Sequence, residues 1–227
     1  NYTSTIYNVS KLRGHRIFNC LSMADGSMLL SGSNGLTKII ENGEALKLFH
    51  AEFGFSQQVQ YVARDLNNWL IVAEVDKVYK LNPQTGQKIE LSESGSNKET
   101  KWLQSVYRLY CDKENNIWFG CQDGVAYCKN DKPKFRVYGD AKPGSAFIKH
   151  AYYLYPQNDS LLYACAENGL YKLNLQSGLA TAIEEGKPYD YIFTAPGGNL
   201  LASAPEGLVE IRKHKPVKFQ DKAFLNA

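Results

Sequence analysis

Residues 106–127 read VYRLYCDKENNIWFGCQDGVAY. Two apolar runs, 106–111 and 117–121, flank the turn-forming segment 112–116, and Asp123-Gly124 introduces a third run. Asn, Asp and Gly tolerate the backbone conformations of tight hairpins, whereas a helix would need ten or more residues without such interruptions. The stretch therefore predicts three short antiparallel strands in succession.

The same pattern of strand, turn and strand occurs five times along the chain. The apolar run after the first turn of each unit is Met28–Ser31, Trp69–Val72, Ile117–Gly120, Leu161–Ala164 or Leu200–Ser203. The following strand begins 38 to 47 residues after its predecessor, at Gly35, Lys77, Gly124, Gly169 and Gly207. Each unit has room for one more strand before and after this pair, and four short strands in such a repeat are typical of a propeller blade.

The fold expected from this repeat is an all-β propeller of about five four-stranded blades in a single domain, residues 1–227. The expected blades cover residues 14–55, 56–103, 104–146, 147–187 and 188–227. Residues 1–13 read as an extra strand that either closes the ring on the last blade or belongs to a preceding blade. The sequence is thus compatible with a closed five-blade ring and with part of a larger propeller.

Composition narrows the class of protein. The 227 residues are 44% hydrophobic and 12% aromatic, enough for a sizeable core. The net charge of +3 is dispersed, which argues against a nucleic-acid-binding surface. No apolar stretch approaches 18 residues, so we expect no transmembrane helix. The five cysteines cannot all pair with one another and include no C-x-x-C, which favours free thiols and leaves a cytoplasmic location open.

Signatures of catalysis are missing from the sequence. It contains no G-x-S-x-G, H-E-x-x-H, P-loop or G-x-G-x-x-G, and its four histidines are far apart. We therefore expect no catalytic residues, no metal site and no cofactor.

Alignment of the five units points to a binding surface instead. We aligned the units on the polar residue directly before the apolar run that follows the first turn. The position eight residues before this polar residue is polar or amphipathic in all five units. The position two residues before that lies on the same face of the strand. Both rows lie near the start of the inner strand, which borders the mouth of a propeller channel. We expect ligand contacts from Asn19, Gln60, Arg108, His150, Tyr152, Tyr189 and Tyr191. The alternative is that these groups simply meet water in the channel.

The third unit closely resembles the two-component regulator propeller repeat. The resemblance rests on Asp112, the turn after it, the run Ile117-Trp118-Phe119-Gly120 and the pair Asp123-Gly124. It extends weakly over the other units, which lack a tryptophan at the position of Trp118. Proteins of that family form the extracytoplasmic sensor of hybrid histidine kinases, common in gut Bacteroidetes, and typically report on glycans.

The resemblance implies a non-enzymatic, periplasmic sensor of a glycan-derived small molecule or oligosaccharide. Its partners would be other domains of the same signalling protein, and a homodimer is left open. Two alternatives stand beside it. One is a scaffold that binds other proteins. The other is a propeller lyase or glycosidase, although a glycosidase needs two facing carboxylates and only Asp190 lies close to the predicted mouth.

Overall fold

A computed structural model describes residues 16–40, 45–48, 53–55, 58–91, 105–129, 135–139, 143–195, 198–212 and 215–218. These residues form five four-stranded antiparallel sheets, and within each sheet the strands lie in sequence order. Each sheet lies within one of the five residue ranges expected for a blade.

The strands have the following bounds. Sheet 1 comprises β1 (Ile17–Ser22), β2 (Met28–Gly32), β3 (Gly35–Ile39) and β4 (Ala45–Leu48). Sheet 2 comprises β5 (Val59–Arg64), β6 (Leu70–Glu74), β7 (Val78–Leu81) and β8 (Lys88–Glu90). Sheet 3 comprises β9 (Arg108–Cys111), β10 (Ile117–Cys121), β11 (Gly124–Cys128) and β12 (Phe135–Tyr138). Sheet 4 comprises β13 (Ala151–Asn158), β14 (Leu161–Ala166), β15 (Gly169–Asn174) and β16 (Leu179–Glu185). Sheet 5 comprises β17 (Ile192–Thr194), β18 (Leu200–Ala204), β19 (Gly207–Arg212) and β20 (Lys215–Lys218).

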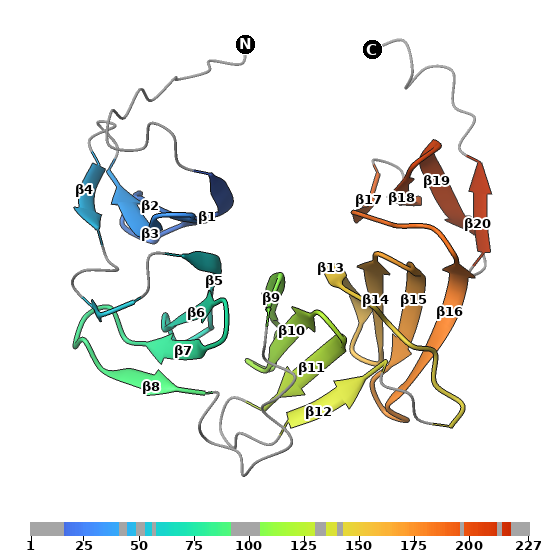
Figure 1. Ribbon diagram of the computed structural model, residues 1–227, viewed down its shortest axis with the longest axis horizontal. Helices are drawn as coiled ribbons and strands as arrows, with labels where there is room; N and C mark the ends of the chain where they lie inside the picture. Colours follow the sequence, from blue (N-terminus) through green and yellow to red (C-terminus); the bar gives the residue numbers. More distant parts are fainter. Residues whose placement is uncertain are drawn as a thin grey trace.

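The sheets follow one another around an arc, with the first strand of each on the inner side and the fourth on the outer side (Figure 1). This arrangement confirms the predicted propeller fold. Sheets 1 and 5 lie at the two ends of the arc. Residues 1–13 lie outside the described residues, so their role in closing a ring stays a prediction.

Turn chemistry explains why the strands end where they do. Gly26, Asn68, Asn115 and Gly198 all have positive φ angles, between 62° and 87°, in the turn between the first and second strands of their sheets. Glycine and asparagine adopt this conformation most readily. The turn residues singled out in the sequence therefore do form the hairpins.

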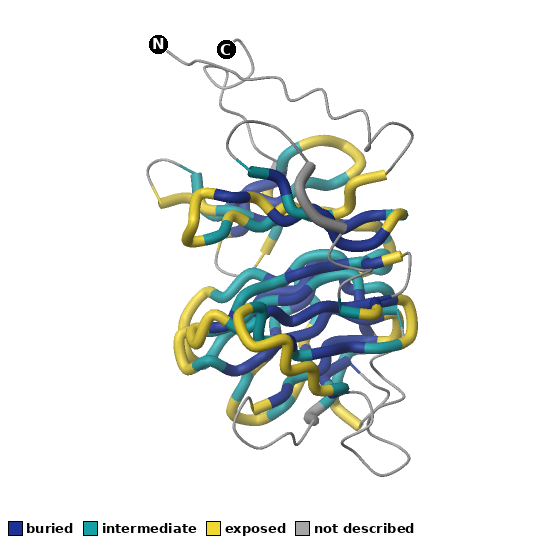
Figure 2. Tube along the Cα trace, turned by 90° about the vertical axis from the view of Figure 1, so that its left-hand side faces the viewer, coloured by how far each residue is buried: buried dark blue, intermediate teal, exposed yellow. Residues whose placement is uncertain are grey.

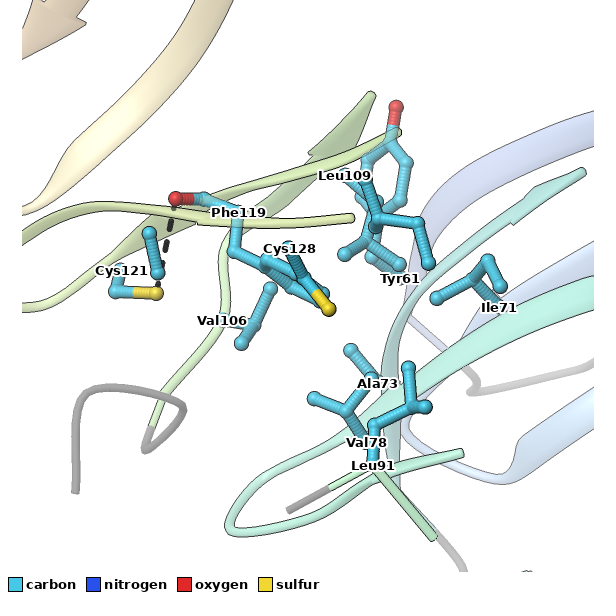
Figure 3. Close-up of a cluster of buried hydrophobic side chains, with 12 residues drawn as sticks. Tyr61, Ile71, Ala73, Val78, Leu91, Val106, Leu109, Phe119, Cys121 and Cys128 are labelled. Carbon is cyan, nitrogen blue, oxygen red and sulfur yellow. Dashed lines mark hydrogen bonds between the residues drawn. The ribbon is translucent and has the colours of Figure 1, made fainter. Parts of the chain in front are cut away.

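Packing between neighbouring sheets supplies the core. Figure 3 shows the cluster between sheets 2 and 3, where Ile71 and Val78 face Phe119, all three fully buried. Burial is concentrated in the strands, while the turns are mostly exposed (Figure 2). Sheets 3 and 4 approach closely at Gly120, where a Cβ atom would lie 2.5 Å from the carbonyl oxygen of Ala151. A small residue is therefore required at this position.

All five cysteines are free thiols. Cys121, Cys128 and Cys165 are buried, as their apolar strand patterns indicate, but Cys20 is exposed. Cys20 lies on β1 of sheet 1, which has a neighbouring sheet on one side only among the described residues. Within the described part of the chain, no helix is long and apolar enough to cross a membrane.

Candidate functional site

One residue on, or directly before, the first strand of each sheet contributes to a row along the inner side of the arc. We call this set the inner-strand row, and its members are Asn19, Tyr61, Arg108, Tyr153 and Tyr191. Four of them are register partners of equivalent second-strand residues, and the carbonyl oxygen of Tyr191 accepts a hydrogen bond from the corresponding Ser203. The row therefore occupies one structural position repeated in five blades.

Arg108 is the centre of this row. Its guanidinium carbon lies 4.9 Å from the ring centre of Tyr61 in sheet 2 and 4.5 Å from that of Tyr153 in sheet 4. Both are cation–π contacts, which stabilise the guanidinium while leaving its N–H donors available. No carboxylate among the described residues forms an ion pair with Arg108. None of the described carboxylates therefore neutralises its charge.

The row continues into sheet 5 through two tyrosines. The rings of Tyr153 and Tyr191 are 4.0 Å apart, and the Tyr153 hydroxyl donates a hydrogen bond of 3.2 Å to the Tyr191 hydroxyl. Burial is the main cause that raises the pKa of Tyr153, followed by its hydrogen bond to Tyr191. Tyr191 is 45% exposed, so this end of the row meets solvent. At the other end, the Asn19 amide oxygen accepts from the Val62 backbone N–H at 3.3 Å and links sheets 1 and 2.

Gln60 and Tyr152 were expected in this row, but the structure places Tyr61 and Tyr153 there. The register shifts near the start of β5 and β13, at Gln60 and Tyr152, and near the start of β1 at Phe18, directly before Asn19. A bulge inserts one unpaired residue and re-aims the side chains around it. The residue after each bulge, rather than the bulge residue itself, occupies the equivalent position.

The choice of residues for aligning the units explains why Gln60 was predicted in place of Tyr61. In the second unit the Asp65 N–H donates to the carbonyl oxygen of Trp69, whereas in the third unit the Asp112 N–H donates to that of Asn116. Asn116 therefore corresponds to Trp69 and not to Asn68. An alignment error of one residue moves the predicted side chain to the opposite face of the strand. The second unit has Trp69 at the turn position where the third unit has the polar Asn116, and this difference misled the alignment.

A second group of side chains lies beside the row, on the residues next to Arg108 and Tyr153. The rings of Tyr107 and His150 are 5.6 Å apart, and those of Tyr107 and Tyr152 are 6.1 Å apart. Glu167 contacts His150 Nδ1 and accepts a hydrogen bond of 2.5 Å from Lys149. The Lys149 bond is the main cause that lowers the pKa of Glu167. His150 and Tyr152 are thus near the row but not in it.

Tyr189 has a different environment from the other predicted residues. It is fully buried between sheets 4 and 5, and its hydroxyl contacts the Glu184 carboxylate. Burial, followed by this contact, raises its pKa. Tyr189 therefore packs the blade interface and does not contribute to an exposed surface. Ligand binding by the remaining residues stays a prediction.

Comparisons with known proteins bear on the fold. No protein-family model matches the sequence, and no curated protein matches it. Among solved structures, the extracellular domain of BT4673 from B. thetaiotaomicron, which has been called both a one-component and a hybrid two-component system, superposes with a TM-score of 0.73 and 15% identity. The match covers 92% of this chain and 28% of that chain.

Two other solved structures are similar to the chain. Virginiamycin B lyase from Staphylococcus aureus, in a catalytically inactive form with quinupristin, gives a TM-score of 0.63 at 14% identity over 92% of this chain and 71% of its own. A chain of the nidogen–laminin complex gives 0.61 at 12% identity over 89% and 78%. These identities are low, so the likenesses show a shared propeller fold, which hosts sensors and enzymes alike.

Proposed function

We propose that this chain is a non-enzymatic, periplasmic ligand-sensing propeller of a two-component signalling protein of the hybrid histidine kinase type. Its ligand would be derived from a glycan and would bind at the inner-strand row. Occupancy of the row would be passed to other domains of the same protein. The resemblance of residues 106–127 to the regulator repeat and the similarity to the BT4673 extracellular domain support this proposal.

The observation that carries the proposal is the environment of Arg108. A guanidinium held between two tyrosine rings presents a planar fork that suits a carboxylate or a pair of hydroxyl oxygens. The exposed Tyr191 ring and the phenolic hydroxyls beside it suit the apolar face and the hydroxyls of a sugar. An oligosaccharide that contains a uronic acid combines both chemistries.

Calorimetry with a uronic-acid oligosaccharide and its neutral counterpart tests this proposal. Arg108→Gln should weaken binding of the acidic ligand by about 10- to 100-fold, because a charge-assisted hydrogen bond contributes about 1.5–3 kcal/mol. Arg64→Gln, on β5 and outside the row, is the matched control and should bind as the wild type does. Equal binding by Arg108→Gln and the wild type would rule out the row as the site.

A lyase is the second candidate, favoured by the contact between His150 and Glu167. A carboxylate that orients a histidine is a common way to prepare a general base. Mass spectrometry after incubation with quinupristin tests this candidate. Turnover by the wild type that is lost in His150→Asn would favour the lyase, and stable substrate would count against this activity.

A further inference from the structure

A cavity of about 450 Å³ opens between sheets 3 and 4, at the end of β9 opposite Arg108. Three aromatic residues of one cross-strand row in sheet 3, Tyr110, Trp118 and Tyr127, contribute to its lining. Leu162 of sheet 4 lies across from them. The volume is within the range of small-molecule sites, and the expected inner-strand binding surface does not include it.

Sheets 1 and 2 show how a lysine can fill this position of the repeat. In sheet 2, Lys80 on β7 reaches the aspartate of the first turn, with 3.1 Å between its ammonium nitrogen and an Asp65 carboxylate oxygen. The same nitrogen lies 5.2 Å from the ring centre of Trp69. In sheet 1, Lys38 on β3 occupies the position of Lys80 and contacts Asp25, which lies two residues later in its turn than Asp65 does, at 2.6 Å. In both sheets an ammonium group thus neutralises the turn carboxylate.

Sheet 3 has the aspartate but lacks the lysine. Tyr127 takes its place, since it pairs with Trp118 in the register in which Lys80 pairs with Ile71. The Asp112 Oδ2 atom instead accepts hydrogen bonds from the Trp118 indole at 3.0 Å and the Asn116 amide at 3.1 Å. Both donors are neutral. No cation among the described residues forms an ion pair with Asp112, so none of them neutralises its negative charge in the cavity wall.

We propose that this cavity binds an organic molecule with a protonated amine, whose ammonium group takes the place that Lys38 and Lys80 fill in sheets 1 and 2. The aromatic row attracts a cation through its ring faces. The oxygens of Asp112 already accept four hydrogen bonds, so Asp112 attracts the ammonium group through its charge and not through a direct hydrogen bond. Glu114, exposed at the rim, accepts one side-chain bond, from Asn116, and can contact the ammonium directly.

The remaining charges at the rim do not prevent cation binding. Lys113 is paired with Asp159 across the two sheets, so its charge is already compensated. Lys129 is exposed, where water and salt screen its repulsion. The carbon frame of the amine would pack against Leu162 and the tyrosine rings. A small amine with a short apolar body therefore fits this cavity better than a bare metal ion.

Calorimetry on the full chain with paired probes tests the proposal. The probes are n-hexylammonium against hexan-1-ol, glucosamine against glucose, and Nα-acetyl-lysine amide against Nα-acetyl-norleucine amide. The last two pairs separate an amino sugar from a basic peptide as the source of the amine. We expect at least one amine to bind at least tenfold more tightly than its neutral partner. Added salt should weaken the binding of the amine more than that of the neutral partner. Equal binding within every pair, or no binding by any amine, would overturn the proposal.

Two variants locate the binding in this cavity. Tyr127→Lys introduces the lysine of sheets 1 and 2 and should abolish amine binding, because its own ammonium group would occupy the position. Glu114→Gln removes one exposed charge and should weaken binding about fivefold. Asp123→Asn makes the same change of charge at the other end of β10 and should have no effect. Wild-type affinity in both Tyr127→Lys and Glu114→Gln would place the amine elsewhere and refute the assignment.

Discussion

Replacing Lys80 by methionine tests how much the buried ion pair of sheet 2 stabilises the propeller. The Asp65 side chain is 0% exposed and that of Lys80 is 14% exposed. Asp65 Oδ1 accepts hydrogen bonds from the backbone N–H groups of Asn67 and Trp69, at 2.8 and 2.9 Å, and Lys80 contacts Oδ2. The carboxylate therefore shapes the turn, while the lysine compensates its charge.

The expected magnitude follows from burial. Removing one partner of a buried ion pair costs about 3–5 kcal/mol, because an uncompensated charge stays behind. Since Lys80 keeps some exposure, we expect about 3 kcal/mol for Lys80→Met. At about 2–4 °C per kcal/mol for a chain of this size, the Tm should fall by roughly 6–12 °C. The double variant Asp65→Asn with Lys80→Met should recover part of this loss, because asparagine keeps the turn acceptor without the charge.

Sheet 1 supplies the matched control. Lys38 occupies the position of Lys80 and pairs with Asp25 of the first turn, whose side chain is 56% exposed. An exposed pair contributes at most about 1 kcal/mol, so Lys38→Met should change stability far less. Urea unfolding followed by circular dichroism measures both variants. If Lys80→Met and Lys38→Met destabilise equally, or if Lys80→Met stays within about 0.5 kcal/mol of the wild type, the argument from burial is refuted.

Three further predictions concern packing and ionisation. Gly120→Ala should destabilise the protein by about 1–3 kcal/mol in urea unfolding, because the new methyl group would lie 2.5 Å from the Ala151 carbonyl oxygen. Burial raises the pKa of Tyr171 to about 12, so the unfolded chain loses this proton at a lower pH than the folded chain does. The free energy of unfolding should therefore fall as the pH rises from about 10 to 12, which Tm measurements over this pH range would record. Burial likewise raises the pKa of Cys111 to about 12, so mass spectrometry at pH 8 should find iodoacetamide on the exposed Cys20 before Cys111.

Each of these three has a clear contrary result. A Gly120→Ala protein as stable as the wild type would mean that sheet 4 can shift away from sheet 3 without loss. A Tyr171→Phe variant should show a smaller fall in Tm at alkaline pH than the wild type. An unchanged dependence of Tm on pH would mean that other groups cause the fall. Alkylation of Cys111 at the rate of Cys20 would contradict the protection of that thiol.

The strands were predictable because their determinants are local. Ile117–Cys121 has the bounds of the apolar run 117–121 between turn residues. The turn after Asp112 could also be predicted, since an aspartate oxygen that caps its own turn needs only neighbouring N–H groups. Even Lys77, where the repeat lacks its glycine, ends a turn because the Glu74 N–H donates to its carbonyl oxygen. Backbone pairing there does not depend on the side chain.

The candidate site was predictable only in part. Asn19, Arg108 and Tyr191 were placed in the row because their units were aligned on equivalent turn residues, Ser27, Asn116 and Asn199. Tyr61 and Tyr153 were missed because their units were aligned one residue too early, on Asn68 instead of Trp69 and on Ser160 instead of Leu161. A displacement of one residue exchanges the two faces of a strand.

The sequence by itself determined the propeller, through a repeat of short strands and turns that can bury both faces only when its units stack. Residues 106–127 contain the whole pattern of one such unit. The tertiary structure alone decided which side chains meet across blades, such as Arg108 with Tyr61 and Tyr153, and that a cavity opens beside Asp112, where Tyr127 stands in place of a lysine. These contacts join residues about 45 positions apart, so they depend on bulges and on the approach of whole sheets, which no local pattern specifies.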